Sequence, residues 1–108
     1  MNHRRESITP LLFEDVKVGD FSPQLRMGPL TRTHFVVYAG ASKDLNPNHH
    51  DEVYARANGN PSVFAMGMLP GGYCARVLTD WFGDGSLRRL RLRFVSRAWP
   101  GEVITCTG

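Results

Sequence analysis

The chain has 108 residues, of which 42% are hydrophobic and 21% charged, and its formal net charge is +3. These proportions are typical of a globular protein and not of a disordered one, and so small a charge does not by itself indicate nucleic-acid binding. No apolar run is long enough for a signal peptide or a membrane span, so we expect a cytoplasmic protein.

The beginning of the chain carries weak structural signals. Residues 1–12 show no periodicity and are expected to be a flexible lead. Residues 13–108 then form a single domain, large enough to support a hydrophobic core. Residues 13–20 end in a Gly-Asp turn, and residues 21–28 are expected to be extended.

Three helices are expected in the middle of the chain. The first covers about residues 31–42, where apolar residues recur at helical spacing and Thr31 or Thr33 is the N-cap. A short helix follows over residues 52–57. The longest is expected over residues 69–82, where an apolar stripe predicts one buried face.

The last part of the chain predicts strands. Residues 87–94 alternate strictly, with leucine and phenylalanine on one face and arginine on the other, which predicts a half-buried antiparallel strand. Residues 102–107 predict another strand.

Gly71 and Gly72 each lower helix propensity by roughly 1 kcal/mol, which predicts a close approach to the first turn of the long helix. A long helix followed by antiparallel strands predicts an α+β fold.

A polar turn over residues 44–51 concentrates the side chains suited to chemistry, and it reads Asp-Leu-Asn-Pro-Asn-His-His-Asp. Pro47 fixes its own φ and keeps Asn46 out of the helical region, so we expect a rigid turn. Asp44 and His49 stand on either side of that turn, where folding brings a carboxylate and an imidazole into one small volume. The pair predicts acid/base chemistry on a water molecule.

The same stretch resembles the signature of the MaoC-like hydratases and dehydratases, a Ser-Gly-Asp-x-Asn-Pro-x-His-x-Asp run that follows a short helix. Here it reads Ser-Lys-Asp-Leu-Asn-Pro-Asn-His-His-Asp over residues 42–51. Residues 65–69, Ala-Met-Gly-Met-Leu, are similar to the family's Ala-His-Gly-Met segment, and residues 93–94 and 100–102 to its Arg-Phe and Pro-Gly-Asp motifs. The resemblance covers nearly the whole chain from residue 13 onward.

This resemblance implies a hotdog fold, in which a central helix is wrapped by an antiparallel β-sheet. It also implies a lyase of lipid metabolism that adds water to 2-enoyl thioesters or removes it from (3R)-hydroxyacyl thioesters. Asp44 and His49 would hold and activate the water, and Asn46 would support their geometry. The Gly67 N–H would face the thioester oxygen, a role that suits a helix start because orphan N–H groups and the helix dipole favour developing negative charge.

The chain departs from the family pattern at several positions. Lys43 replaces a glycine, and Asn48 stands where an apolar residue is usual. Met66 replaces the histidine before Gly67, which bears on substrate fit. The family fold continues through further strands after Thr107, so the resemblance implies that the C-terminal strands are missing from this chain or are supplied by another one.

Five arginines crowd into residues 88–97 and admit two interpretations. They form the solvated face of a strand, or they bind phosphates of coenzyme A or of a carrier-protein arm, since arginine matches phosphate geometry. On the second interpretation Arg91 and Arg93 are candidate substrate-binding residues. Met66 is a further candidate, because its position bears on substrate fit. No cofactor is expected beyond the coenzyme A or phosphopantetheine that forms part of the substrate.

The histidines and cysteines do not predict a metal site. His49 and His50 are adjacent in sequence, with no paired ligand elsewhere, and Cys74 and Cys106 lack metal-type spacing and are expected to be free thiols. We expect a homodimer, or a heterodimer with another hotdog subunit. The alternative functions are an incomplete or non-catalytic partner subunit of a heteromeric hydratase and a hotdog thioesterase.

Overall fold

The computed structural model of the protein describes residues 11–108, so most of the lead expected over residues 1–12 lies outside the described residues. The described part of the chain opens with a 3-10 helix and an extended stretch, and a strand and three α-helices precede the final strand. In chain order the elements are η1 (Phe13–Asp15), β1 (Leu25–Met27), α1 (Arg32–Ser42), η2 (Pro47–His49), α2 (Glu52–Ala57), α3 (Met68–Phe82) and β2 (Ile104–Cys106).

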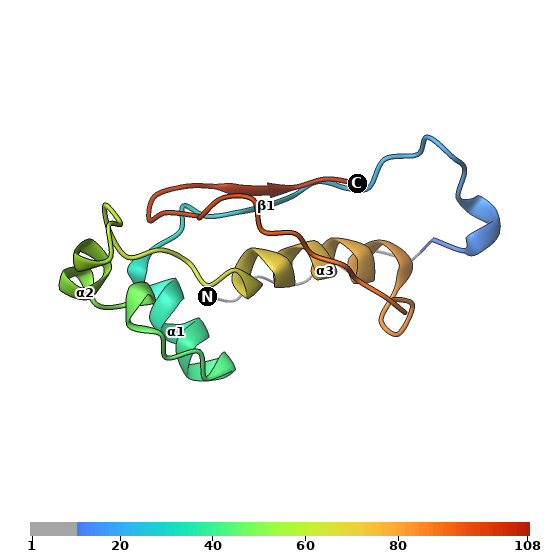
Figure 1. Ribbon diagram of the computed structural model, residues 1–108. Helices are drawn as coiled ribbons and strands as arrows, with labels where there is room; N and C mark the ends of the chain where they lie inside the picture. Colours follow the sequence, from blue (N-terminus) through green and yellow to red (C-terminus); the bar gives the residue numbers. More distant parts are fainter. Residues whose placement is uncertain (1–10) are drawn as a thin grey trace.

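Strands β1 and β2 pair in antiparallel orientation although they come from opposite halves of the chain (Figure 1). Leu25 lies opposite Cys106, and Met27 lies opposite Ile104. This two-stranded ribbon runs along α3, which contacts both strands, while α1 and α2 lie together at one end of the molecule. A long helix against antiparallel strands is the predicted α+β arrangement.

The helices begin close to the predicted positions because their caps are encoded locally. The Thr31 hydroxyl accepts the N–H of His34 at 3.2 Å, and His34 Nδ1 accepts the N–H of Thr31 at 2.9 Å. Thr31, and not Thr33, is therefore the N-cap of α1. Asp51 caps α2 by accepting the N–H of Tyr54 at 3.1 Å. Each cap satisfies an N–H that the helix itself leaves without a partner.

The hydrophobic core gathers where α1, α2 and the start of α3 meet. Phe35 and Met66 are fully buried there. The buried cluster consists of Leu30, Phe35, Ala39, Ala55, Val63, Ala65, Met66 and Leu69. The polar turn over residues 44–51 connects α1 to α2, and both of these helices contribute side chains to the buried cluster.

The two early glycines of α3 differ in their surroundings. A Cβ added at Gly71 would lie 2.8 Å from Leu92 Cδ1, whereas one added at Gly72 would meet nothing within 4 Å. The predicted close approach to the first turn of the helix is confirmed at Gly71 and wrong at Gly72.

The strand predicted over residues 87–94 does not form. Residues 87–97 make no backbone hydrogen bond as donors to any other described residue, and none of residues 87–96 accepts one. The segment runs along α3, with Leu92 against Gly71 and Phe94 against Gly67. The alternation correctly predicted exposed arginines. A strand also requires backbone hydrogen bonds to a neighbouring strand, and this segment makes none with the described residues.

Among residues 11–108, no helix has both the length and the apolar character needed to cross a membrane.

Candidate active site

The turn after α1 is shaped by hydrogen bonds within it. Lys43 takes the left-handed conformation, with φ of 60°, and so ends α1 and redirects the chain. The Asp44 N–H donates to Ser42 Oγ at 3.2 Å, and the Asn48 N–H donates to Asn46 Oδ1 at 3.0 Å. Asn46 thereby caps η2, which Pro47 begins. These contacts give the rigid turn that the sequence predicted.

The backbone conformation of Lys43 explains why the MaoC-like signature has a glycine at this position. A left-handed backbone costs a residue with a Cβ roughly 1–2 kcal/mol, and glycine avoids that cost. Asn48, the other departure within the turn, has its Oδ1 buried with no hydrogen-bond partner among the described residues. Both substitutions keep the shape of the turn at some expense in stability.

His49 is the only buried polar residue in the described part of the chain. Its Nδ1 lies 2.7 Å from the carbonyl oxygen of Phe64, and its Nε2 lies 3.7 Å from Asp44 Oδ2. A carbonyl oxygen only accepts hydrogen bonds, so Nδ1 must carry a proton. In the neutral imidazole, Nε2 is then unprotonated and its lone pair points toward Asp44.

The Asp44 carboxylate faces both the imidazole and solvent, and its side chain is 45% exposed where that of His49 is 8% exposed. A separation of 3.7 Å exceeds a hydrogen bond. Two acceptors that face each other need a donor between them, and a water molecule has two O–H groups to supply it. The geometry is therefore suited to holding one water on both groups.

Phe64 is the residue of this site that the sequence did not indicate. Besides accepting from His49, it donates its own N–H to the Asn48 carbonyl at 3.2 Å. Its ring meets the imidazole edge-on, with centroids 5.0 Å apart and planes at 86°. Trp99 packs edge-on against the same ring at 5.8 Å, and the Arg97 guanidinium lies 5.1 Å from its centroid.

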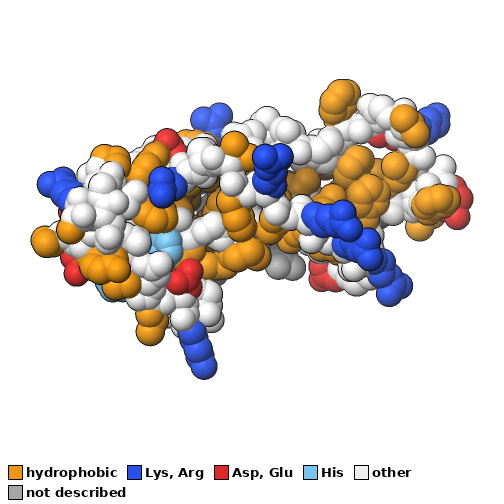
Figure 2. All heavy atoms as spheres, viewed as in Figure 1, with side chains coloured by type: hydrophobic (Ala, Val, Ile, Leu, Met, Phe, Trp, Pro, Cys, Tyr) orange, Lys and Arg blue, Asp and Glu red, His pale blue; other side chains and the backbone are white. Residues whose placement is uncertain are grey.

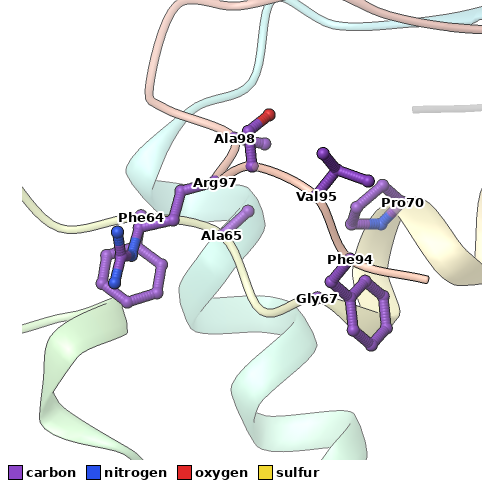
Figure 3. Close-up of a pocket in the computed structure, with 9 residues that line it drawn as sticks. Phe64, Ala65, Gly67, Pro70, Phe94, Val95, Arg97 and Ala98 are labelled. Atoms are coloured by element: carbon purple, nitrogen blue, oxygen red, sulfur yellow. The ribbon is translucent and has the colours of Figure 1, made fainter.

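A pocket of about 400 Å³ opens beside Phe64 (Figure 3). Its two walls come from the approach to α3 and from the segment before β2, and the Ala65 N–H joins them by donating to the Ala98 carbonyl at 2.9 Å. The lining residues are Phe64, Ala65, Gly67, Pro70, Phe94, Val95, Ser96, Arg97 and Ala98. The pocket is thus mostly apolar, with Arg97 as its one charged side chain.

Gly67 stands at the start of α3 and lines this pocket. Within residues 11–108 its N–H donates to no other residue. A Cβ at this position would come within 3.2 Å of the Phe94 ring, so the close packing favours glycine. Met66, the neighbouring candidate substrate-binding residue, is fully buried in the core and does not line the pocket.

Arg91 and Arg93 are exposed and lie outside the pocket lining. Figure 2 shows basic side chains gathered over the C-terminal half of α3, where residues 87–94 cross the helix. Arg97 is the member of the arginine run that lines the pocket, and the sequence gave no sign that this residue would differ from the others. None of these arginines forms an ion pair with a described residue.

The described residues bring together no group of three His, Cys, Asp or Glu side chains that could hold a metal ion. Asp44 and His49 come together as predicted, Asn46 shapes their turn, and Gly67 borders the adjoining pocket.

A long helix laid along an antiparallel ribbon, with an Asp–His pair on the turn beside it, is the arrangement of an α+β protein. The sequence model of one family, described as the MaoC-like domain, matches residues 20–107. The chain belongs to this MaoC-like domain family.

The proteins similar to the chain over most of its length include two curated relatives and a solved structure. An (R)-specific enoyl-CoA hydratase of Rhodospirillum rubrum is 31% identical over 97 residues, covering 88% of this chain and 66% of the relative. The 3-oxo-4,17-pregnadiene-20-carboxyl-CoA hydratase beta subunit of Mycobacterium tuberculosis is 29% identical over 92 residues, covering 84% and 70%. The chain thus spans about two thirds of the length of these relatives.

The similar structure is a chain of the ChsH1-ChsH2 complex from Mycobacterium tuberculosis. It superposes with a TM-score of 0.74 at 29% identity, covering 82% of this chain and 70% of that one. Sequence and structure therefore agree on the family and on its hotdog fold.

Proposed function

We propose that this chain catalyses the reversible addition of water to 2-enoyl thioesters with (3R) stereochemistry. The observation that carries the proposal is the Asp44–His49 pair. Its buried imidazole is fixed by the Phe64 carbonyl, and its free nitrogen lies 3.7 Å from the carboxylate. A hydratase named for the same stereochemistry is among the relatives, which supports the assignment.

Each group has a distinct task in the proposed reaction. Asp44 and His49 hold the water, and His49 Nε2 takes one of its protons as the oxygen bonds to C3 of the enoyl group. Asp44 stabilises the imidazolium that results. The proton then passes to C2, so both hydrogens and the oxygen of water end in the product, and dehydration reverses these steps.

Negative charge develops on the thioester oxygen when water adds to C3. The Gly67 N–H is a free donor at the start of α3, where the helix dipole also favours negative charge. The apolar pocket beside it is suited to the acyl or pantetheine chain, and the exposed arginines to the phosphates of the thiol carrier. Arg91 and Arg93 remain proposed substrate-binding residues on this basis. Met66 has no such basis, because it is buried in the core and lies outside the pocket lining.

Substitution of the pair tests the proposal. We expect Asp44→Asn and His49→Gln each to lower kcat for crotonyl-CoA hydration by about 10²–10⁴-fold, the typical contribution of a general acid–base group. His50→Gln is the matched control, because His50 is exposed and lies outside the pair. Circular dichroism checks that the variants fold.

An Asp44→Asn variant that folds and hydrates crotonyl-CoA at the parent rate would contradict the proposal. Product masses identify the reaction, since a hydroxyacyl thioester indicates hydration, whereas a free acid with released thiol indicates the thioesterase alternative.

A second candidate function is that of a subunit that needs a hotdog partner. The backbone of residues 87–97, which pairs with no other segment in residues 11–108, favours it, and one relative is named a beta subunit. Activity measured for the chain alone and after co-expression with a neighbouring hotdog subunit separates the two. An inactive chain rescued by the partner supports the second candidate, and a fully active isolated chain contradicts it.

A further inference from the structure

Two cysteines that lie outside the proposed active site face each other across the fold. Cys74 stands in α3 and Cys106 ends β2, and their Sγ atoms are 3.9 Å apart. Both are free thiols, with Cys74 exposed and Cys106 buried. Neither lines the pocket beside Phe64.

The packing of α3 against the β1–β2 ribbon holds this pair together. A disulfide requires an S–S distance of about 2 Å, so the two sulfurs need to move by no more than about 2 Å in total. Rotation of a cysteine side chain moves its sulfur by distances of that size. The backbone of both elements is already placed by helix–strand packing, so a bond needs little rearrangement.

We propose that Cys74 and Cys106 form a modification site, at which a hydroperoxide converts the two thiols to a disulfide that joins α3 to β2. The sulfur of Cys74 attacks one peroxide oxygen, the O–O bond breaks, and a sulfenic acid forms as water or an alcohol leaves. The sulfur of Cys106 then attacks that of Cys74. The S–O bond breaks, and the hydroxyl leaves as water with the Cys106 proton.

The surroundings of the two thiols fix the order of these steps. Burial, together with the neighbouring Cys74, raises the pKa of Cys106 to about 11. Cys106 therefore keeps its proton at neutral pH and is shielded from solvent, whereas Cys74 is accessible to the peroxide. Cys74 is the thiol that reacts first, and Cys106 is the resolving thiol.

Treatment of the full chain with hydrogen peroxide tests this site. After one equivalent of peroxide and a quench with iodoacetamide, intact mass should show the loss of two hydrogens and no alkylation. Peptide mapping without reductant should show Cys74 linked to Cys106, and dithiothreitol should restore both alkylation sites. The urea midpoint of the wild-type chain should rise on oxidation and return on reduction.

Three outcomes would overturn the proposal. One is Cys74 found as sulfinic or sulfonic acid with Cys106 still open to alkylation. Another is a wild-type chain that stays fully reduced. The third is a disulfide between two chains, seen as doubled mass on a denaturing gel without reductant. The control variant Cys106→Ser should stop at the sulfenic acid of Cys74, which a dimedone probe labels.

Discussion

At the scale of single residues, the two nitrogens of His49 have different environments and so different tasks. Nδ1 is held by a backbone carbonyl that the fold places, which fixes the tautomer without using a second carboxylate. Asp44 can thereby direct its Oδ2 to the other nitrogen and to water, while its Oδ1 accepts the N–H of Asn46 at 3.4 Å. The division depends on Phe64, whose backbone and ring both contact His49.

Phe64→Leu tests that dependence. The carbonyl stays, but the edge-on contact with the imidazole is lost, and such contacts contribute about 0.5–1.5 kcal/mol. We expect kcat for enoyl-thioester hydration to fall up to about tenfold, since 1.4 kcal/mol corresponds to a factor of ten. Steady-state kinetics measures this, and ¹⁵N NMR of the histidines reports whether His49 keeps the Nδ1–H form.

The matched control is Phe82→Leu, at the far end of α3. It should leave kcat and the His49 resonances unchanged. If Phe64→Leu raised KM alone, with kcat and the tautomer preserved, Phe64 would be only a wall of the pocket.

The pair itself could be predicted from the sequence, whereas its support could not. Asp44 and His49 lie five positions apart on a turn that Pro47 stiffens, so local geometry alone brings them together. Phe64 acts mainly through its backbone carbonyl, a group that every residue has. The position of this carbonyl depends on the path that the chain takes from the end of α2 back to the turn. No pattern of side chains in the sequence predicts that path.

At the scale of elements, the start of α3 is shaped by the segment that crosses it. Leu92 lies against Gly71, and Phe94 lies against Gly67. Glycine allows residues 87–94 to lie close to the helix axis, and the same packing places Phe94 beside the pocket. Of the two glycines inside α3, the packing therefore uses Gly71 and not Gly72, while Gly67, the N-cap, makes room for Phe94.

Alanine substitution separates these roles. Gly72→Ala should stabilise the chain by about 0.5–1 kcal/mol, because alanine has the higher helix propensity and the new Cβ meets nothing. Gly71→Ala should gain less or nothing, because Leu92 must move to make room. Urea unfolding of the two variants measures the difference. Equal stabilisation by both would show that Leu92 does not pack against Gly71.

Residues 87–94 show what periodicity predicts about an element and what it does not. Strict alternation correctly placed the arginines in solvent. It did not produce a strand, because strand formation depends on hydrogen bonds to another segment and not on the sequence of the segment itself. Helix caps are different, since Thr31 and Asp51 find their partners three residues away, and Thr31 was one of the two caps predicted for its helix.

At the scale of the whole molecule, the described chain is elongated, with extents of 52 × 30 × 23 Å and a radius of gyration of 16.0 Å. A compact domain of about this length has a radius near 13 Å. Large hydrophobic side chains also remain exposed within residues 87–97, including Val95 at 86% and Phe94 at 59%. A surface that combines unpaired backbone with exposed apolar side chains is typical of one that another strand covers.

We therefore expect the chain to assemble in solution, through contacts that include residues 87–95. Light scattering after size exclusion should give at least twice the mass of one chain, either alone or with a co-expressed hotdog subunit. Val95→Glu should shift the distribution toward the single-chain mass, because it places a charge among the apolar side chains of this surface. Val18→Glu is the control, since Val18 is also fully accessible but lies in the loop between η1 and β1. A single-chain mass for the unmodified protein under both conditions, or equal dissociation by the two variants, would contradict this assignment of the surface.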